Sequence, residues 1–201
     1  MKKTLLLIVY LLLTACYKAP TPLTKLPGDA VILAFGDSLT YGTGASPEHD
    51  YPSILGKLTT LEVINEGVPG EISSDGLKRL PALLDEYRPK LLILIHGGND
   101  IIKKIPNEQI TDNLKQMITE AKNRNIEVVM LGVPQPNPLL LNSAVLYRNI
   151  ADTQQVLIDF DTLPGILGDN RLKSDMIHPN DAGYQLMATN IFKLLQDAGA
   201  L

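Results

Sequence analysis

The chain has 201 residues, a length typical of one domain. Its formal net charge is -4, and Lys and Arg form no block or stripe, which argues against a nucleic-acid-binding surface. Tryptophan is absent and aromatic residues make up 5% of the chain, which disfavours an aromatic platform for stacking sugar rings.

The N-terminus has the pattern of a secretory signal. Lys2 and Lys3 form a short basic start, and residues 4–13 form an apolar stretch that is too short to span a membrane comfortably. Small residues then precede Cys16, the only cysteine of the chain. This arrangement resembles the lipobox of bacterial lipoproteins, which implies cleavage before Cys16 and lipidation of that cysteine. An ordinary signal peptide and an uncleaved anchor are the alternatives.

The sequence therefore divides into three parts. We predict a signal peptide over residues 1–15, a lipidated cysteine with a proline-rich tether over 16–28, and one folded domain over 29–201. Tyr17 follows the cysteine, where an aspartate would resemble an inner-membrane retention signal. We therefore expect a lipid-anchored protein of the Gram-negative cell envelope, at the outer membrane. With Cys16 acylated no free thiol remains for a disulfide or a cysteine-based metal site.

From residue 29 onward, short apolar runs alternate with longer amphipathic runs. The apolar runs predict strands over residues 30–35, 62–65, 91–95, 127–132 and 156–160. The amphipathic runs predict helices over residues 51–59, 74–86, 107–123, 140–154 and 181–198. Continuous apolar strands are typical of a parallel sheet covered on both faces, and the alternation predicts right-handed crossovers. We expect an α/β fold with five parallel strands.

Polar residues mark the starts of two of these helices. Ser73 and Ser74 are possible N-caps of the helix over 74–86, and Asn180 or Asp181 is a possible N-cap of the last helix. Loops over residues 36–38, 67–70, 97–100 and 134–138 are expected at the carboxyl edge of the sheet, and a late loop over 168–179 precedes the final helix. Such loops on a rigid scaffold commonly carry catalytic residues.

The first apolar run ends abruptly in Gly36, Asp37 and Ser38. This ending places a serine hydroxyl at the carboxyl edge of the sheet, where α/β proteins carry out their chemistry. A serine is a poor nucleophile unless a base removes its proton, so Ser38 on its own fits a helix cap or a turn equally well. Asp37 adjoins Ser38 and is expected to hold the loop rather than to act as the base.

Among the three histidines, His178 has the best surroundings for a general base. His49 lies in a polar loop, and His96 ends an apolar strand, where a structural role is plausible. Asp175 precedes His178 by three residues, a spacing that brings both side chains to one side of a turn. The carboxylate can then accept the Nδ1 proton of the imidazole and fix its tautomer. A solvated surface pair is the alternative, and three rival acids lie farther away in sequence: Asp159, Asp161 and Asp169.

An acyl-transfer site also needs donors for a developing oxyanion. The sequence offers three: the backbone N–H of Ser38, the backbone N–H of Gly70 and the side-chain amide of Asn99. Taken alone, Gly70 fits an ordinary turn glycine, because Gly and Asn both favour positive φ.

These segments together resemble the ordered blocks of the GDSL/SGNH hydrolases, closest to the bacterial arylesterase, thioesterase I and lysophospholipase type. The resemblance rests on Gly36-Asp37-Ser38-Leu39, Gly70, Gly97-Gly98-Asn99-Asp100 and Asp175-Met176-Ile177-His178-Pro179. It implies a flavodoxin-like three-layer sandwich, a catalytic triad of Ser38, His178 and Asp175, and an oxyanion hole of Ser38, Gly70 and Asn99. His96 stands where members of the family often carry an apolar residue.

The expected function is hydrolysis of carboxylic esters or thioesters through an acyl-enzyme, with no cofactor and no metal. The partners expected are a small acyl ester or thioester and, through the anchor, a membrane; the oligomeric state is open. A carbohydrate O-acetyl esterase of the envelope is the alternative enzyme. A surface lipoprotein that only binds is the non-enzymatic alternative.

Apolar residues beside these loops are expected to form the acyl pocket. They are Ile72, Ile101, Ile102 and residues 139–141, with residues 134–138 at the rim. Each of them fits a core position or a helix start as well.

Overall fold

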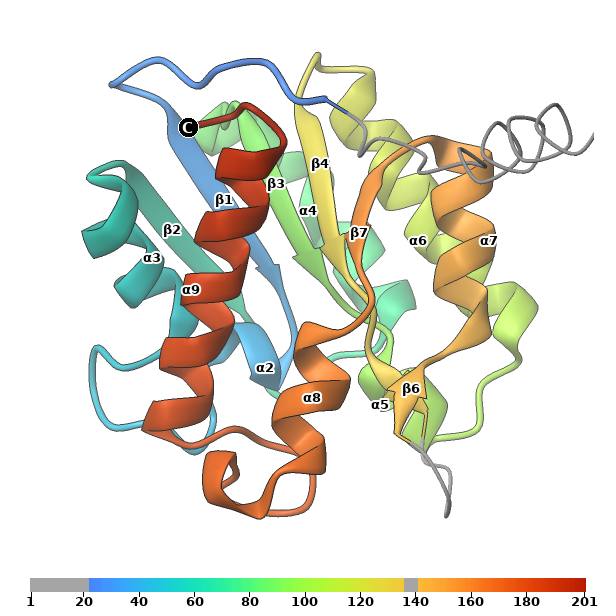
Figure 1. The fold of residues 1–201 in the computed structure, drawn as a ribbon. Helices are drawn as coiled ribbons and strands as arrows, with labels where there is room; N and C mark the ends of the chain where they lie inside the picture. Colours follow the sequence, from blue (N-terminus) through green and yellow to red (C-terminus); the bar gives the residue numbers. More distant parts are fainter. Residues whose placement is uncertain (1–21, 136–140) are drawn as a thin grey trace, which may run out of the picture.

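The computed structural model describes residues 22–135 and 141–201 (Figure 1). The predicted signal peptide, Cys16 and the first part of the predicted tether lie outside the described residues. So do residues 136–140, which include most of the predicted pocket rim together with Leu139 and Leu140.

Five parallel strands form the central sheet. They are β1 (Val31–Gly36), β2 (Glu62–Gly67), β3 (Leu91–Ile95), β4 (Glu127–Leu131) and β7 (Leu157–Asp159), in the order β2-β1-β3-β4-β7. Every neighbouring pair is parallel. The predicted α/β fold is confirmed, and each strand bound lies within two residues of its predicted position.

Helices cover both faces of the sheet, as the continuous apolar strands require (Figure 1). One layer holds α3 (Tyr51–Thr59) and α9 (Asp181–Asp197), with α8 (Thr162–Gly168) packed against α9. The opposite layer holds α4 (Ser73–Tyr87), α6 (Asn107–Lys122) and α7 (Val145–Gln154). All five residues of β3 are buried between these layers.

The strand order creates a switch point between β1 and β3. The chain leaves β1 for the edge strand β2 and then passes back to β3 on the other side of β1. The loops that follow β1 and β3 therefore turn toward opposite faces of the sheet and leave a crevice at its carboxyl edge. Ser38 follows β1 and Asn99 follows β3, so the fold brings both to this crevice.

Several short elements could not be predicted from the hydrophobic periodicity of the sequence. They are α2 (Ser38–Tyr41), α5 (Gly98–Ile102), α8, a 3₁₀ turn (Asn170–Leu172), and the antiparallel pair of β5 (Pro134–Gln135) with β6 (Asn142–Ser143). The predicted helix over 140–154 is wrong at its start, since α7 begins only at Val145. The Ser143 hydroxyl lies 2.8 Å from the Gly132 carbonyl oxygen and 2.7 Å from that of Phe160, which ties this segment to the ends of β4 and β7.

One of the two predicted caps is correct. Asn180 caps α9, and its Oδ1 accepts the N–H of Gly183 at 3.0 Å. Helix α4 begins one residue earlier than predicted and has no side-chain cap, because Ser73 binds elsewhere. The Ser73 N–H and hydroxyl both donate to the carboxylate of Asp100, at 2.8 and 2.5 Å.

Part of the predicted tether packs on the domain. The N–H of Leu23 donates to Ala198 O at 2.9 Å, and that of Leu26 donates to Ala200 O at 2.8 Å. The N–H of Thr24 lies 3.0 Å from the carboxylate oxygens of Glu127, the first residue of β4. Residues 23–26, which belong to the predicted tether, therefore pack on the domain. No helix among the described residues is both long and apolar enough to cross a bilayer.

Candidate active site

A sharp turn between β1 and α2 presents Ser38. The carboxylate of Asp37 caps α2 by accepting the Leu39 N–H at 3.0 Å, and Ser38 is the first helical residue. The turn packs tightly against β2, where a Cβ on Gly67 would lie 2.0 Å from Tyr41 N. Asp37 therefore holds the loop, as expected from the sequence, and the small residue at 67 gives α2 room.

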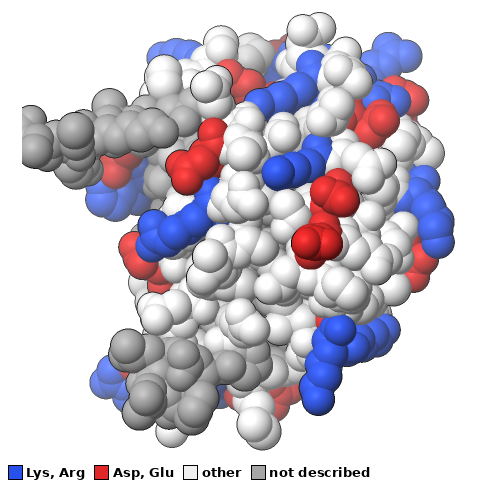
Figure 2. Space-filling model, turned by 90° about the vertical axis from the view of Figure 1, so that its right-hand side faces the viewer, with Lys and Arg blue, Asp and Glu red and all other residues white. Residues whose placement is uncertain are grey.

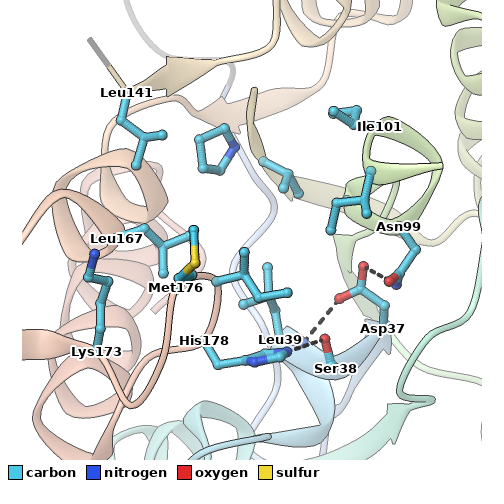
Figure 3. A pocket seen from close by; sticks show the side chains of 15 residues that line it. Asp37, Ser38, Leu39, Asn99, Ile101, Leu141, Leu167, Lys173, Met176 and His178 are labelled. Atoms are coloured by element: carbon cyan, nitrogen blue, oxygen red, sulfur yellow. Dashed lines mark hydrogen bonds between the residues drawn. The ribbon is translucent and has the colours of Figure 1, made fainter. Parts of the chain in front are cut away.

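Ser38, His178 and Asp175 form one hydrogen-bonded chain, and Figure 3 shows its contact between His178 and Ser38. His178 Nε2 lies 3.0 Å from Ser38 Oγ, and His178 Nδ1 lies 2.7 Å from Asp175 Oδ2. An ionised carboxylate only accepts hydrogen bonds, so Nδ1 donates to Asp175 and Nε2 is left to accept the Ser38 hydroxyl proton. Ser38 and His178 are 140 positions apart along the chain, and their contact is the one that the predicted roles of nucleophile and base require.

The loop that carries His178 is fixed by its own backbone. Ser174 N donates to His178 O at 3.0 Å, and Lys173 forms an antiparallel bridge with Pro179. The loop packs against Gly44, where a Cβ would lie 2.1 Å from Ser174 Oγ. These contacts hold the imidazole in place over Ser38, so little reorganisation is needed for proton transfer.

The environment of Asp175 favours its ionised form. Desolvation opposes ionisation, but hydrogen bonds from the His178 ring and from the N–H groups of Ile177 and His178 outweigh it and lower the pKa of Asp175. Both backbone bonds end on Oδ1 at 2.8 Å, which leaves Oδ2 for the imidazole. The carboxylate is therefore charged and oriented at neutral pH.

Asn99 and the segment around Gly70 lie next to each other. The Asn99 side-chain amide donates to Glu71 O at 3.0 Å and contacts Asp37 Oδ2 at 3.3 Å. Gly70 has φ +80, and Glu71 N donates to Val68 O at 3.2 Å, as expected for a type II turn with Gly70 at its third position. This hydrogen bond does not use the Gly70 N–H. Gly70 is not one of the residues that line the pocket described below.

Burial sets the protonation behaviour of Asp37. Its side chain is 2% exposed, and burial raises the pKa of the carboxyl group. A buried carboxyl group that is bonded to a helix N–H and to an amide is a structural member of the site, with no free path to the Ser38 proton.

A largely apolar pocket of about 440 Å³ opens beside Ser38 (Figure 3). This volume is in the range of small-molecule sites. Ile101, Ile102 and Leu141 line it as predicted, whereas Ile72 does not. Sequence reasoning missed other lining residues, among them five from the loop after β4, from α8 and from the His178 loop: Val133, Leu167, Lys173, Met176 and Ile177.

No metal site is evident in the part of the chain that the structure describes, where no three His, Cys, Asp or Glu side chains gather as ligands.

The outer face over α6 and α7 shows acidic and basic side chains interspersed (Figure 2).

A doubly wound parallel sheet with a Ser–His–Asp chain at its switch point defines a hydrolase of the SGNH type. Residues 34–186 match the model of the GDSL-like lipase/acylhydrolase family, and the chain belongs to this family.

Named relatives agree with this assignment. The chain is 29% identical to esterase TesA of Pseudomonas aeruginosa over 92% of this chain and 97% of that protein. It is 33% identical to an arylesterase of Vibrio mimicus over 74% of this chain and 79% of that protein. It is 29% identical to thioesterase 1/protease 1/lysophospholipase L1 of Escherichia coli over 82% and 83% of the two chains.

Solved structures share the fold. The crystal structure of TesA superposes with a TM-score of 0.74 at 25% identity and covers 84% of this chain and 99% of that chain. Esterase EstA from Pseudoalteromonas, inhibited by monoethylphosphonate, superposes with a TM-score of 0.75 at 22% identity, over 84% of this chain and 97% of that chain.

Proposed function

We propose that this protein hydrolyses carboxylic esters or thioesters of apolar acyl groups through an acyl-enzyme on Ser38. The observation that carries the proposal is the 3.0 Å contact between Ser38 Oγ and His178 Nε2 at the wall of an apolar pocket. The names of the relatives, which include an esterase, an arylesterase and a thioesterase, support the same reaction class.

The reaction begins with proton transfer to His178. Ser38 Oγ attacks the carbonyl carbon while its proton passes to His178 Nε2, and Asp175 stabilises the imidazolium that forms. Collapse of the tetrahedral intermediate passes this proton to the leaving alcohol or thiol. A water molecule activated by His178 then hydrolyses the acyl-enzyme and restores the Ser38 hydroxyl.

The Ser38 N–H, the Gly70 N–H and the Asn99 amide are the proposed donors to the tetrahedral oxyanion. In the free protein the Asn99 amide contacts both Glu71 O and, at the longer distance of 3.3 Å, Asp37 Oδ2. We infer that the longer contact gives way to the oxyanion, since the remaining bond to Glu71 still orients the amide.

The pocket wall favours an apolar acyl group over a sugar. Apart from His178 and the buried Asp37, its ionisable member is Lys173, and most of the rest are aliphatic. Such a wall offers few hydrogen bonds to a polysaccharide, which counts against the O-acetyl esterase alternative. An ordered proton-transfer chain likewise counts against a protein that only binds.

A Ser38→Ala variant tests the reaction. We expect loss of p-nitrophenyl ester hydrolysis with an unchanged circular dichroism spectrum, because only the nucleophile is removed. A fluorophosphonate probe should label the parent protein and not this variant. Equal rates in parent and variant would refute the proposal.

Chain length tests the substrate class. Each methylene buried in an apolar pocket contributes about 0.8 kcal/mol, so kcat/KM should rise about fourfold per added methylene until the pocket is full. The measurement is a series of p-nitrophenyl esters from acetate upward. A maximum at acetate, with faster hydrolysis of acetylated glycans, would favour the O-acetyl esterase instead.

We also propose that Cys16 carries the lipid anchor at the outer membrane. This rests on the sequence around Cys16, which lies outside the described residues. Metabolic labelling with an alkyne fatty acid should mark the parent protein and not a Cys16→Ser variant, and cell fractionation should find the label in outer-membrane vesicles.

A further inference from the structure

Two buried polar side chains near the pocket have no part in the reaction described above. The His96 side chain is 0% exposed and that of Glu71 is 7% exposed. A buried carboxylate is costly unless charged or polar partners compensate it. The residues that bond the Glu71 carboxylate therefore show how its position is fixed.

The Arg79 guanidinium binds the Glu71 carboxylate through two parallel hydrogen bonds. Its Nε donates to Glu71 Oε1 at 2.7 Å, and its Nη2 donates to Oε2 at 2.9 Å. The same Nη2 donates to Glu66 O at 2.8 Å, and the guanidinium stacks 4.2 Å above the Phe35 ring. Bidentate bonding and stacking fix the carboxylate in direction as well as in position.

His96 completes the set of donors to Glu71. Its Nδ1 accepts the Gly97 N–H at 3.0 Å, so in the neutral ring Nε2 carries the hydrogen and donates it to Glu71 Oε2 at 3.1 Å. His96 directly follows β3 and lies three residues ahead of Asn99. The ring therefore links the turn between β3 and α5, the helix that carries Asn99, to the loop that carries Gly70.

The backbone of Glu71 meets the oxyanion donors directly. Its carbonyl oxygen accepts the Asn99 amide at 3.0 Å, and its N–H closes the turn onto Val68 O. Gly70 lies between Val68 and Glu71 in this turn. A displacement of Glu71 would therefore move both the Gly70 N–H and the Asn99 amide.

We propose that Glu71, held by Arg79 and His96, is the positioning residue of the oxyanion hole. The inference rests on the proposed acyl transfer at Ser38. It gives His96 a role through Glu71: the ring touches no reacting atom and fixes the place of two of the three donors. A misplacement of about 1 Å at a catalytic donor can lower the rate on the order of 10²-fold.

Two substitutions weaken the hydrogen bonding between Glu71 and its partners Arg79 and His96 without changing the oxyanion donors themselves. In His96→Leu and in Glu71→Gln, we expect kcat to fall about 10- to 100-fold while KM changes less than about threefold, because the lost interaction acts in the transition state. In His96→Gln, a side-chain amide can again donate to Glu71, and kcat should recover most of the loss seen in His96→Leu.

An inhibitor series separates positioning from a general structural effect. A boronic acid adduct of Ser38 places an oxygen in the oxyanion hole, whereas the product carboxylic acid binds the pocket without that covalent step. In His96→Leu the boronate should bind weaker by the same factor as the fall in kcat/KM, and the product acid should bind as it does to the parent.

The matched control is Arg124→Met. Arg124 also bonds two carboxylates, those of Asp85 and Glu120, and its side chain is 27% exposed against 24% for Arg79. It does not line the pocket, so kcat should stay at the parent value. The Arg79→Met variant should instead lose activity as His96→Leu does.

Three results would overturn the inference. They are a kcat of His96→Leu and Glu71→Gln equal to that of the parent, a rise in KM with kcat unchanged, or an equal loss in Arg124→Met. Should Glu71→Gln not fold, the His96 pair and the inhibitor series decide. If instead the parent itself shows no Ser38-dependent hydrolysis, the proposed function fails, which is a separate and distinguishable outcome.

Discussion

At the scale of the residue, the site depends on a carboxylate whose two oxygens have different tasks. Asp175 Oδ1 holds the loop through two N–H groups, and Oδ2 holds the imidazole. In Asp175→Asn the amide can turn its NH₂ toward Nδ1 and favour the wrong tautomer of His178. We expect kcat to fall on the order of 10²- to 10⁴-fold, measured by ester hydrolysis, with the fold intact by circular dichroism. An unchanged kcat would exclude Asp175 from the triad.

Glu71 should give the protein a pH-dependent stability. Desolvation opposes its ionisation, but hydrogen bonds from His96 and Arg79 and the Arg79 charge outweigh it and lower the pKa of Glu71. A lowered pKa means that the stabilising contribution is complete above the ordinary glutamate range and is lost as the pH falls through the lowered value. Urea unfolding should therefore show a parent that is more stable than Glu71→Gln at neutral pH, with the difference shrinking in acid. A difference that is constant with pH would contradict this.

At the scale of the element, α4 must approach the His96 side chain closely. A Cβ on Gly76 would lie 2.5 Å from His96 Nε2, so Gly76→Ala should destabilise the protein by about 1–3 kcal/mol although alanine favours helices. Gly165 in α8 is the matched control, since nothing lies within 4 Å of its added Cβ. Gly165→Ala should stabilise by about 0.5–1 kcal/mol. Urea unfolding checks both, and equal effects would show that α4 has room at this point.

The elements that could be predicted are those whose signal is local. Strand β3 is one apolar run in the sequence, and the spacing of three residues between Asp175 and His178 predicts their contact. Helices α2 and α5 have four and five residues, too few to show a helical period, and their starts depend on the turns after β1 and β3.

Elements that depend on distant partners could not be predicted. Ser73 could have capped α4, but its hydroxyl bonds Asp100, 27 residues later. Ser143 bonds carbonyl groups at the ends of β4 and β7, and this interrupts an apolar run that favours a helix. The hydrogen bond between His96 and Glu71 likewise joins residues 25 positions apart, so the sequence shows His96 only as an unexplained polar residue at a strand end.

At the scale of the whole molecule, the chain enters the domain at the end opposite the active site. Residues 23–26 bind the C-terminal end of α9 and the start of β4, at the amino edge of the sheet (Figure 1). Ser38 lies at the carboxyl edge, beyond the six residues of β1, which at about 3.3 Å per residue separate the two edges by about 20 Å. A lipid on Cys16 would therefore hold the domain by the end that is remote from the pocket.

This placement predicts where an anchored enzyme finds its substrate. Residues 16–21 can span at most about 20 Å, so we expect the pocket to open away from the bilayer that holds the lipid. Water-dissolved esters should be hydrolysed at the same kcat/KM by the acylated protein on vesicles and by a Cys16→Ser variant in solution. An ester embedded in the vesicle that carries the enzyme should be cleaved no faster than one in a separate vesicle. The domain could turn its carboxyl edge to its own membrane only with residues 16–21 almost fully extended, so faster cleavage in the shared vesicle would contradict the proposed orientation.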